Sequence, residues 1–189
     1  MYKRISLFLT VVATLLLTAC GGEKSVEVGP YTVSVIDPNV YHIQDYNASY
    51  PAGEYFDEEG NLTHFNNCSD IYLIVGDEAA LLIDLSNKIN WADNADASLK
   101  QLVAERIGDK PLTITFTHNH GDHLGMLPAF LEDDVHFALP RNDFGALAER
   151  FPQNKYSFFD EGHLFELGGA KVEAIAVPGH TNGSMVFYL

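Results

Sequence analysis

Four residues that can bind a metal ion fall within six positions of the chain, at His118, His120, Asp122 and His123. Zinc and similar ions bind imidazole nitrogen and carboxylate oxygen, and they need several such ligands to converge from a rigid frame. Residues two apart on an extended segment project to the same side, so His118 and His120 can reach one ion. Asp122 and His123 then face a neighbouring position, which fits a pair of metal ions. A chain of this composition would contain the pattern by chance about once in a thousand cases.

The alternative for this cluster is a polar loop whose histidines are satisfied by water and backbone groups. This hypothesis gives no reason for three of the eight histidines to fall within one six-residue stretch. Other histidines lie in strands, in a long loop or at a turn, where an exposed or hydrogen-bonded histidine is the ordinary case. We therefore place four of them outside the metal site: His42, His64, His136 and His163.

The residues just before the cluster indicate a strand over 112–117, so the metal-binding residues would sit at the C-terminal end of a strand. Before this strand, a helix is predicted over 95–107, where apolar residues recur at helical spacing and Gly108 then ends the helix. A short helical stretch is predicted after the cluster, from Leu124 to Leu131. These elements form the frame that must position the cluster.

Further strands are predicted on both sides of this frame. Two apolar runs around a tight turn, 71–75 and 79–84, are typical of strands buried on both faces. An alternating pattern predicts a hairpin of 31–36 with 40–44, and a long acidic loop follows over 45–67. After the cluster we expect a strand over 135–139, a helix from about Asp143 to Arg150 capped by Asn142, and strands over 164–167, 171–177 and 184–189. This mixture predicts an α/β or α+β fold.

The composition is that of one acidic globular domain. Hydrophobic residues make up 47% of the 189 residues, and 11 Lys and Arg against 26 Asp and Glu give a formal net charge of −15. Nucleic-acid affinity depends largely on Lys and Arg, so we expect no nucleic-acid partner. The two cysteines, Cys20 and Cys68, are too few for a disulfide framework, and Cys68 is expected to be a small semi-buried residue.

The first twenty residues have the features of an export signal. A positive start is followed by a mostly apolar run over 5–17 that is too short to span a bilayer. The Leu-Thr-Ala-Cys sequence ending at Cys20 resembles the lipobox of bacterial lipoproteins, in which the peptide is cut before the cysteine and the thiol carries diacylglycerol. We therefore expect a signal peptide over 1–19, lipidation of Cys20 and a tether over 20–30. Two or three acyl chains would anchor the protein stably in the cell envelope, facing the periplasm or the exterior.

Two motifs and one strand pair resemble the metallo-β-lactamase superfamily. The family signature Thr-His-x-His-x-Asp-His is found over Thr117 to His123, and its Pro-Gly-His-Thr-x-Gly-Ser signature over Pro178 to Ser184. The family's Asn-x-Tyr-Leu-Ile stretch, with its later Leu-Leu-Ile-Asp-Thr-Gly, is similar to Ser69 to Ser86. The resemblance extends over residues 31–189, which we take as the domain.

The resemblance implies an αββα sandwich and a site for two zinc ions, with iron as the alternative metal. His118, His120 and His180 would hold the first ion, and Asp122 and His123 would contribute to the second. Asp84 would orient a ligand histidine, or be a turn residue at a strand end.

The mechanism implied by the family uses a metal-bound hydroxide that attacks a carbonyl or another electrophilic centre. Asp122 would orient this nucleophile. The expected substrate is a small ester, thioester, lactone or lactam. Two other hypotheses for the function remain. One is a non-catalytic lipoprotein that keeps the fold as a binding or scaffold module, and the other is a mononuclear iron oxygenase that uses the same ligands.

The family's second half supplies a metal-bridging Asp and a last His beyond the region of His180. This chain ends at Leu189, so these two ligands have no position in it. We therefore expect the N-terminal half of the sandwich with part of the second half, as in a C-terminally truncated chain.

Overall fold

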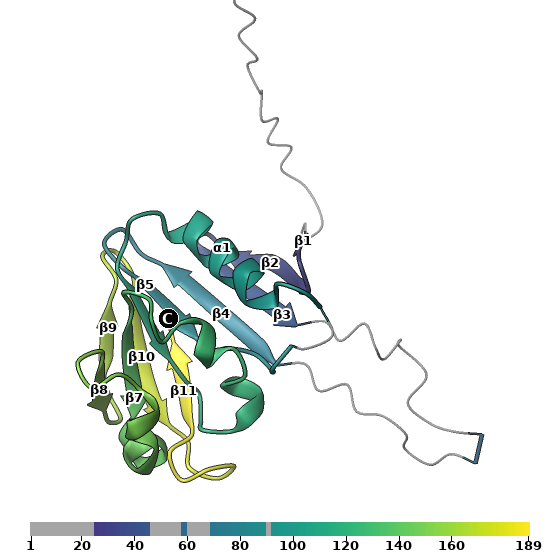
Figure 1. The fold of residues 1–189 in the computed structure, drawn as a ribbon. Coiled ribbons are helices and arrows are strands. Elements are labelled where there is room, and N and C mark those ends of the chain that lie inside the picture. Colours follow the sequence, from purple (N-terminus) through teal and green to yellow (C-terminus); the bar gives the residue numbers. More distant parts are fainter. Residues whose placement is uncertain (1–24, 46–57, 60–68, 90–91) are drawn as a thin grey trace, which may run out of the picture.

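Two β-sheets form the frame of the molecule in the computed structural model, which describes residues 25–45, 58–59, 69–89 and 92–189 (Figure 1). The larger sheet has the strand order β1 to β8. Its strands are β1 (Val26–Val28), β2 (Tyr31–Asp37), β3 (Val40–Asp45), β4 (Asp70–Val75), β5 (Ala80–Ile83), β6 (Leu112–Thr115), β7 (His136–Pro140) and β8 (Tyr156–Phe159). The smaller sheet has the order β11-β10-β9, with strands β9 (Leu164–Glu166), β10 (Lys171–Ala176) and β11 (Met185–Tyr188).

The direction of the strands changes within the larger sheet. Strands β1 to β5 pair antiparallel, whereas β5, β6, β7 and β8 run parallel. The pair of β2 with β3 is the predicted hairpin, and β4 with β5 are the two apolar runs predicted around a tight turn. Parallel neighbours need crossover connections, and these contain α1 (Ala95–Ile107), short 3₁₀ helices and α2 (Arg141–Phe144). The carboxyl ends of the parallel strands therefore meet at one edge of the sheet, where the segments after β5, β6 and β7 lie near one another.

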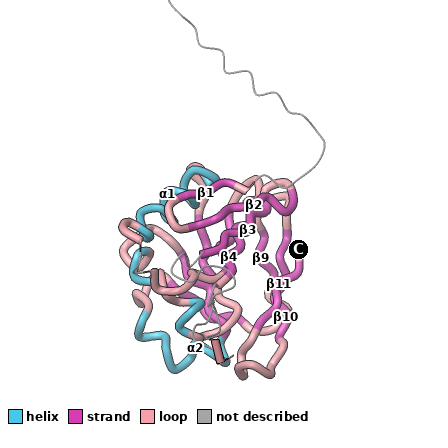
Figure 2. The backbone as a smooth tube through the Cα atoms, turned by 90° about the vertical axis from the view of Figure 1, so that its right-hand side faces the viewer, coloured by secondary structure: helices cyan, strands magenta, loops and turns pink. Residues whose placement is uncertain are grey.

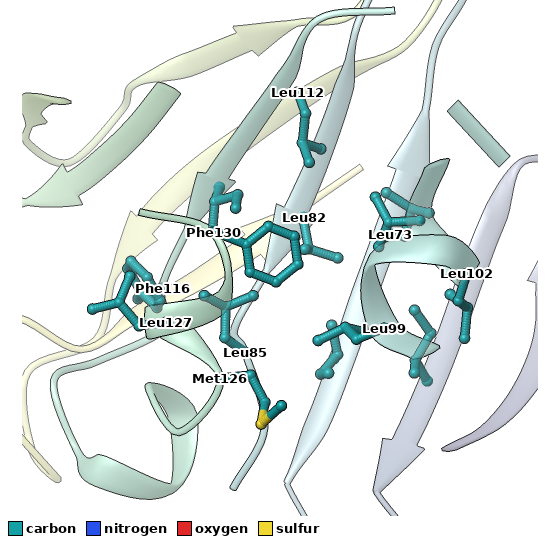
Figure 3. Close-up of a cluster of buried hydrophobic side chains, with 14 of the residues drawn as sticks. Leu73, Leu82, Leu85, Leu99, Leu102, Leu112, Phe116, Met126, Leu127 and Phe130 are labelled. Atoms are coloured by element: carbon teal, nitrogen blue, oxygen red, sulfur yellow. The ribbon is translucent and has the colours of Figure 1, made fainter. Parts of the chain in front are cut away.

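Helix α1 covers one face of the larger sheet. It has the predicted bounds, and Gly108 ends it with a positive φ of 61°. Its apolar stripe, which includes Leu99 and Leu102, is fully buried. Figure 3 shows these two side chains beside Leu73 and Leu82 of the sheet, with Phe130 of the following segment in the same cluster. The apolar residues at helical spacing in the sequence are thus the residues that the helix buries.

A second apolar core lies between the two sheets. Ile74, Leu81 and Ile83 of the larger sheet belong to the same buried cluster as Val172 and Met185 of the smaller sheet. Figure 2 shows α1 on one side of the large sheet and β9 to β11 on the other. The layers are therefore helix, sheet and sheet, which confirms the mixed α/β sandwich expected from the sequence.

Several local expectations need correction. The tether expected over 20–30 is wrong at its end, because Val26–Val28 forms β1 and pairs with the edge of β2. The helix expected from about Asp143 is also wrong at its start: α2 follows Pro140, not an Asn142 cap, and continues as a 3₁₀ helix over Gly145–Arg150. Strand β8 was not predicted. The predicted burial on both faces is confirmed for β5, but it is wrong for β4, where Tyr72 is exposed.

Some expectations concern residues that the structure does not describe. The signal peptide, Cys20, Cys68, His64 and most of the long loop over 45–67 lie outside the described residues. Within the part of the chain that is described, no helix is both long and apolar enough to cross a membrane.

Candidate metal centre

Three histidines converge at the carboxyl edge of the parallel strands. His118 and His120 follow β6, and His180 precedes β11. One ligand nitrogen from each ring can be chosen so that all three lie within 4.8 Å of one another. The backbone of His120 is extended, with φ −76° and ψ 152°, which agrees with the expectation that alternate residues project to one side. The spacing predicted the first two members of this group, and the family resemblance predicted the third.

The ring of His118 has the character of a metal ligand. Its Nε2 atom is buried and has no hydrogen-bond partner among the described residues, while its Nδ1 atom lies 3.0 Å from the hydroxyl of Thr117. Burial lowers the pKa of His118, and the neighbouring rings of His123, His120 and His180 lower it further against the opposing charge of Asp84. A neutral imidazole with an unused nitrogen is the form that binds a metal ion. The chemistry of His118 therefore fits a metal ligand.

Asp84 fixes the orientation of His123. Its carboxylate accepts hydrogen bonds from His123 Nδ1 at 2.8 Å, from Thr117 N at 2.8 Å and from Thr117 Oγ1 at 2.7 Å. Burial lowers the pKa of His123, but the hydrogen bond and charge of Asp84, with the charges of Asp122 and Asp45, raise it overall. With Nδ1 occupied in this way, Nε2 of His123 is the nitrogen left for a ligand.

Asp122 and His123 lie together beside the three histidines. They belong to a 3₁₀ helix over Gly121–His123, and Asp122 Oδ2 is 3.6 Å from His123 Nε2. The ring centroid of His123 is 4.2 Å from that of His118. The side chain of Asp122 keeps 36% of its surface exposed, so solvent reaches its carboxylate. All five residues expected to bind metal are thus near one another, and their role as ligands stays a prediction.

The segment after β5 is hydrogen-bonded to the backbone around His123. Leu85 N donates to His123 O, and Gly125 N donates to Ser86 O. Ser86 has a left-handed backbone with φ 61°, and its hydroxyl donates a 2.6 Å hydrogen bond to the buried carboxylate of Asp45. Sequence reasoning missed Asp45, which ends β3 and is brought to this segment only by the pairing of the strands.

Sequence reasoning also missed Asp143. This residue was read as the start of a helix, but its carboxylate accepts hydrogen bonds from the segments that carry His118, His120 and His180. One signal in the sequence could have found it. Asp143 follows the predicted strand over 135–139, as His118 follows the one over 112–117, and the parallel pairing seen in the structure brings these two strand ends to the same edge of the sheet.

Histidines predicted to lie outside the site have other neighbours. His42 Nε2 is 2.9 Å from Asp70, His136 Nε2 is 2.8 Å from Ser157 Oγ, and His163 stacks on Phe159.

A mixed α/β sandwich with a histidine cluster at the carboxyl edge of its parallel strands defines a candidate metal-binding protein. Residues 69–189 match the sequence profile of the Metallo-beta-lactamase superfamily. The chain belongs to this superfamily.

Curated relatives of the chain include two named hydrolytic proteins. An atrochrysone carboxyl ACP thioesterase from Emericella nidulans is 32% identical over 123 residues, covering 64% of this chain and 36% of the thioesterase. A hydroxyacylglutathione hydrolase from Aeromonas hydrophila is 32% identical over 110 residues, covering 57% of this chain and 41% of the hydrolase. The matched part of the chain thus spans at most 41% of the length of these two relatives.

Solved structures share the fold. A flavo di-iron protein from Thermotoga maritima superposes with a TM-score of 0.63 at 19% identity, covering 85% of this chain and 41% of that protein. A metallo-beta-lactamase from Pontibacter korlensis superposes with a TM-score of 0.58 at 22% identity, covering 84% and 66%.

Proposed function

We propose that this chain is the metal-binding part of a hydrolase that acts on a small acyl compound. The observation that carries the proposal is the convergence of His118, His120 and His180, with a buried and unpartnered nitrogen on the first of them. A buried polar atom without a partner costs about 1–3 kcal/mol, so such a nitrogen points to a ligand that the folded chain is built to receive.

The proposed metal is zinc, in keeping with a ligand set of imidazoles and a carboxylate. His118, His120 and His180 would hold one ion, and Asp122 with His123 would contribute to a second. When bound, such ions supply a hydroxide near neutral pH and positive charge that stabilises a developing oxyanion.

Protein groups around the site would prepare the ligands and the attacking water. The Asp84 carboxylate keeps the proton of His123 on Nδ1, and the two hydrogen bonds from Thr117 hold that carboxylate in place. Burial lowers the pKa of His118, which favours the neutral ring that a metal ion binds. We assign to the partly exposed carboxylate of Asp122 the task of accepting a hydrogen bond from the attacking water and so orienting it.

The proposed substrate class is supported by the relatives and by the charge of the chain. The thioesterase and the hydroxyacylglutathione hydrolase are both named for the hydrolysis of acyl compounds. The net charge of −15 disfavours a polyanionic substrate. We therefore place acyl thioesters and esters first, with lactones and lactams as the other members of the proposed class.

A hydrolysis assay on the full chain tests this function. The protein is stripped with a chelator, reloaded with Zn²⁺ or with Fe²⁺, and assayed on an acylglutathione thioester, an acyl lactone and a chromogenic β-lactam. Turnover of at least one substrate should disappear on chelation, return with zinc and be lost in His118→Ala. The matched control is His136→Ala. It removes an exposed histidine whose ring is hydrogen-bonded to Ser157 Oγ, away from the histidine cluster, and it should keep full turnover. Unchanged turnover in both His118→Ala and His120→Ala would contradict the proposal.

We also infer that the mature protein is anchored to a membrane of the cell envelope through Cys20. The supporting observation is the Leu-Thr-Ala-Cys sequence after the apolar run over 5–17. Mass spectrometry of the N-terminal peptide from a bacterial host should find cleavage before Cys20 and a diacylglycerol adduct. A Cys20→Ala variant should lose the adduct and leave the membrane fraction, whereas an unmodified N-terminus in the unsubstituted chain would refute the anchor.

A further inference from the structure

A single carboxylate, that of Asp143, connects the two segments that carry the three histidines. The side chain is buried, with 7% of the residue surface exposed. Its Oδ2 atom accepts hydrogen bonds from Asn119 N at 3.2 Å and from Thr181 Oγ1 at 2.7 Å. Its Oδ1 atom accepts one from Gly183 N at 2.7 Å. The backbone carbonyl of Asp143 accepts a fourth hydrogen bond, from Asn119 Nδ2 at 3.0 Å.

Two of the partners of Asp143 are immediate neighbours of the histidines. Asn119 stands between His118 and His120, and Thr181 directly follows His180. These partners are 24 and 38 residues away from Asp143 in the sequence. One carboxylate therefore fixes the backbone beside all three rings, although it is not a member of the histidine group.

The contact between Asp143 and the second segment is tight. A Cβ atom added to Gly183 would lie 2.6 Å from Asp143 N and 2.7 Å from Asp143 Oδ1, so only glycine allows the backbone to come this close. The same segment is closed by Ser184, whose hydroxyl accepts a 3.1 Å hydrogen bond from Thr181 N. Met185 N then donates to Thr117 O at 2.8 Å, which ties the start of β11 to the residue before His118.

A role in the helix itself does not account for these bonds. Asp143 lies in the first turn of α2, but both of its carboxylate oxygens accept from the histidine segments. Burying a charged group is costly unless it is fully hydrogen-bonded, and here the charge is matched by two backbone N–H groups and one hydroxyl. The position therefore needs a carboxylate that holds two segments together.

We infer that Asp143 is a positioning residue that sets the geometry of the metal centre by holding the His118–His120 segment against the His180 segment. The inference rests on the proposed function only in taking the three histidines as metal ligands. As a positioning residue, Asp143 would contact neither the metal ion nor the substrate. It acts through Asn119, Thr181 and Gly183, and its loss should leave the ligands present but not held in register.

Zinc affinity of the full chain tests the inference without any turnover. Competition against a chromophoric chelator gives the affinity, and the visible spectrum of the Co²⁺-loaded protein reports the geometry at the ion. Asp143→Ala should weaken zinc binding by about 10–100-fold and alter the cobalt spectrum. Asp143→Asn should lose less, because one oxygen remains while the amide NH₂ opposes an N–H donor of Asn119 or Gly183.

Thr181→Val gives an independent variant if Asp143→Ala does not fold. It removes the hydroxyl that donates to Asp143 Oδ2 and keeps the carboxylate, so it should reproduce part of the loss. The matched control is Val172→Ala, which opens the core between the sheets and removes none of the hydrogen bonds of the Asp143 carboxylate. It should lower the melting temperature and keep the affinity for zinc.

The outcomes separate the positioning role of Asp143 from the proposed function. Wild-type affinity and cobalt spectrum in folded Asp143→Ala, or in both Asp143→Asn and Thr181→Val, would overturn the positioning role. An equal loss in Val172→Ala would also overturn it, because general destabilisation would then explain the effect. Zinc binding without hydrolysis in the unsubstituted chain would refute the proposed function alone. An unsubstituted chain that binds no zinc would overturn both.

Discussion

The carboxylate of Asp84 lies 2.8 Å from Nδ1 of His123, and the two residues are 39 positions apart in the sequence. Asp84 has a left-handed backbone with φ 64° and is 2% exposed. A buried carboxylate in such a conformation at the end of β5 can accept from Thr117, just after β6, and from the 3₁₀ helix at the same time. This arrangement selects the tautomer of His123 before any ligand binds.

Removing the charge of Asp84 should weaken metal binding. Asp84→Asn keeps a residue that tolerates a positive φ, so the backbone should be retained while the carboxylate is lost. We expect zinc affinity to fall by about 10–100-fold, because the amide leaves a single acceptor oxygen for the donors of His123 and Thr117 and so orients His123 less well. Competition titration with a chromophoric chelator measures the change.

The control for this variant is Asp70→Asn, which breaks another Asp–His pair on the exposed side of the sheet, at 2.9 Å from His42. It should bind zinc as the unsubstituted chain does. An Asp84→Asn protein with unchanged affinity would show that His123 is oriented by other contacts.

Adding a methyl group at Gly183 should destabilise the chain. Gly183→Ala places a Cβ atom 2.6 Å from Asp143 N and 2.7 Å from Asp143 Oδ1, so one of the two segments must move. Overpacking of this kind costs about 1–3 kcal/mol. Urea denaturation followed by circular dichroism measures the loss.

Gly145→Ala is the matched control, because an added Cβ there meets nothing within 4 Å and the backbone is right-handed helical. Its effect should be neutral or slightly stabilising, by up to about 1 kcal/mol. Equal stability of the two variants would count against the tight contact at Gly183.

Truncating Leu99 should test the packing of α1 on the sheet. The side chain is 0% exposed and lies in the core cluster with Leu73 and Leu82. Leu99→Ala should lower the free energy of unfolding by about 2–5 kcal/mol, since it removes buried methyl groups and leaves a cavity. The exposed Leu164 supplies the comparison: Leu164→Ala should change stability far less, and a similar loss in both variants would argue against the described packing.

Alkaline pH should destabilise the chain through Tyr31. Burial raises the pKa of Tyr31, and the charges of Asp45 and Asp96 raise it further. An unfolded tyrosine ionises near pH 10, whereas folded Tyr31 keeps its proton, so above about pH 10 the unfolded state releases a proton that the folded state retains. The contribution to stability is therefore complete below this pH and is lost as the pH rises.

Tyr31→Phe should flatten this dependence. Urea denaturation at about pH 8 and about pH 11 should show a smaller fall in unfolding free energy than in the unsubstituted chain. Stability at the lower pH should be kept or increased, because the Tyr31 hydroxyl is buried with no hydrogen-bond partner among the described residues. Tyr188→Phe, at an exposed position, should leave the dependence unchanged. A Tyr31→Phe protein that loses as much stability at high pH would disprove the assignment.

Local signals in the sequence were enough to predict much of the fold. Helix α1 was predicted with its observed bounds, because residues at helical spacing share one buried face. Strands β4 and β5 were predicted as apolar runs and β6 as the strand before the histidines, and all three agree with the structure to within two residues at either end. Strand β1 could not be predicted in the same way, because three residues have no stable structure without the edge of β2 beside them.

The sequence by itself determined the chemistry of the candidate site. Histidines at alternate positions after a strand, followed by Asp122 and His123, specify which groups can bind metal, because residue type and local spacing are properties of the chain. The family resemblance predicted Asp84 as a residue that orients a ligand histidine, but only the tertiary structure decided that Asp45 and Asp143 also hold these segments. Asp84, Asp45 and Asp143 each end or follow a different strand, and sheet pairing brings them to the same edge. The hydrogen bonds of their carboxylates join residues between 24 and 42 positions apart, where local patterns carry no information about contact.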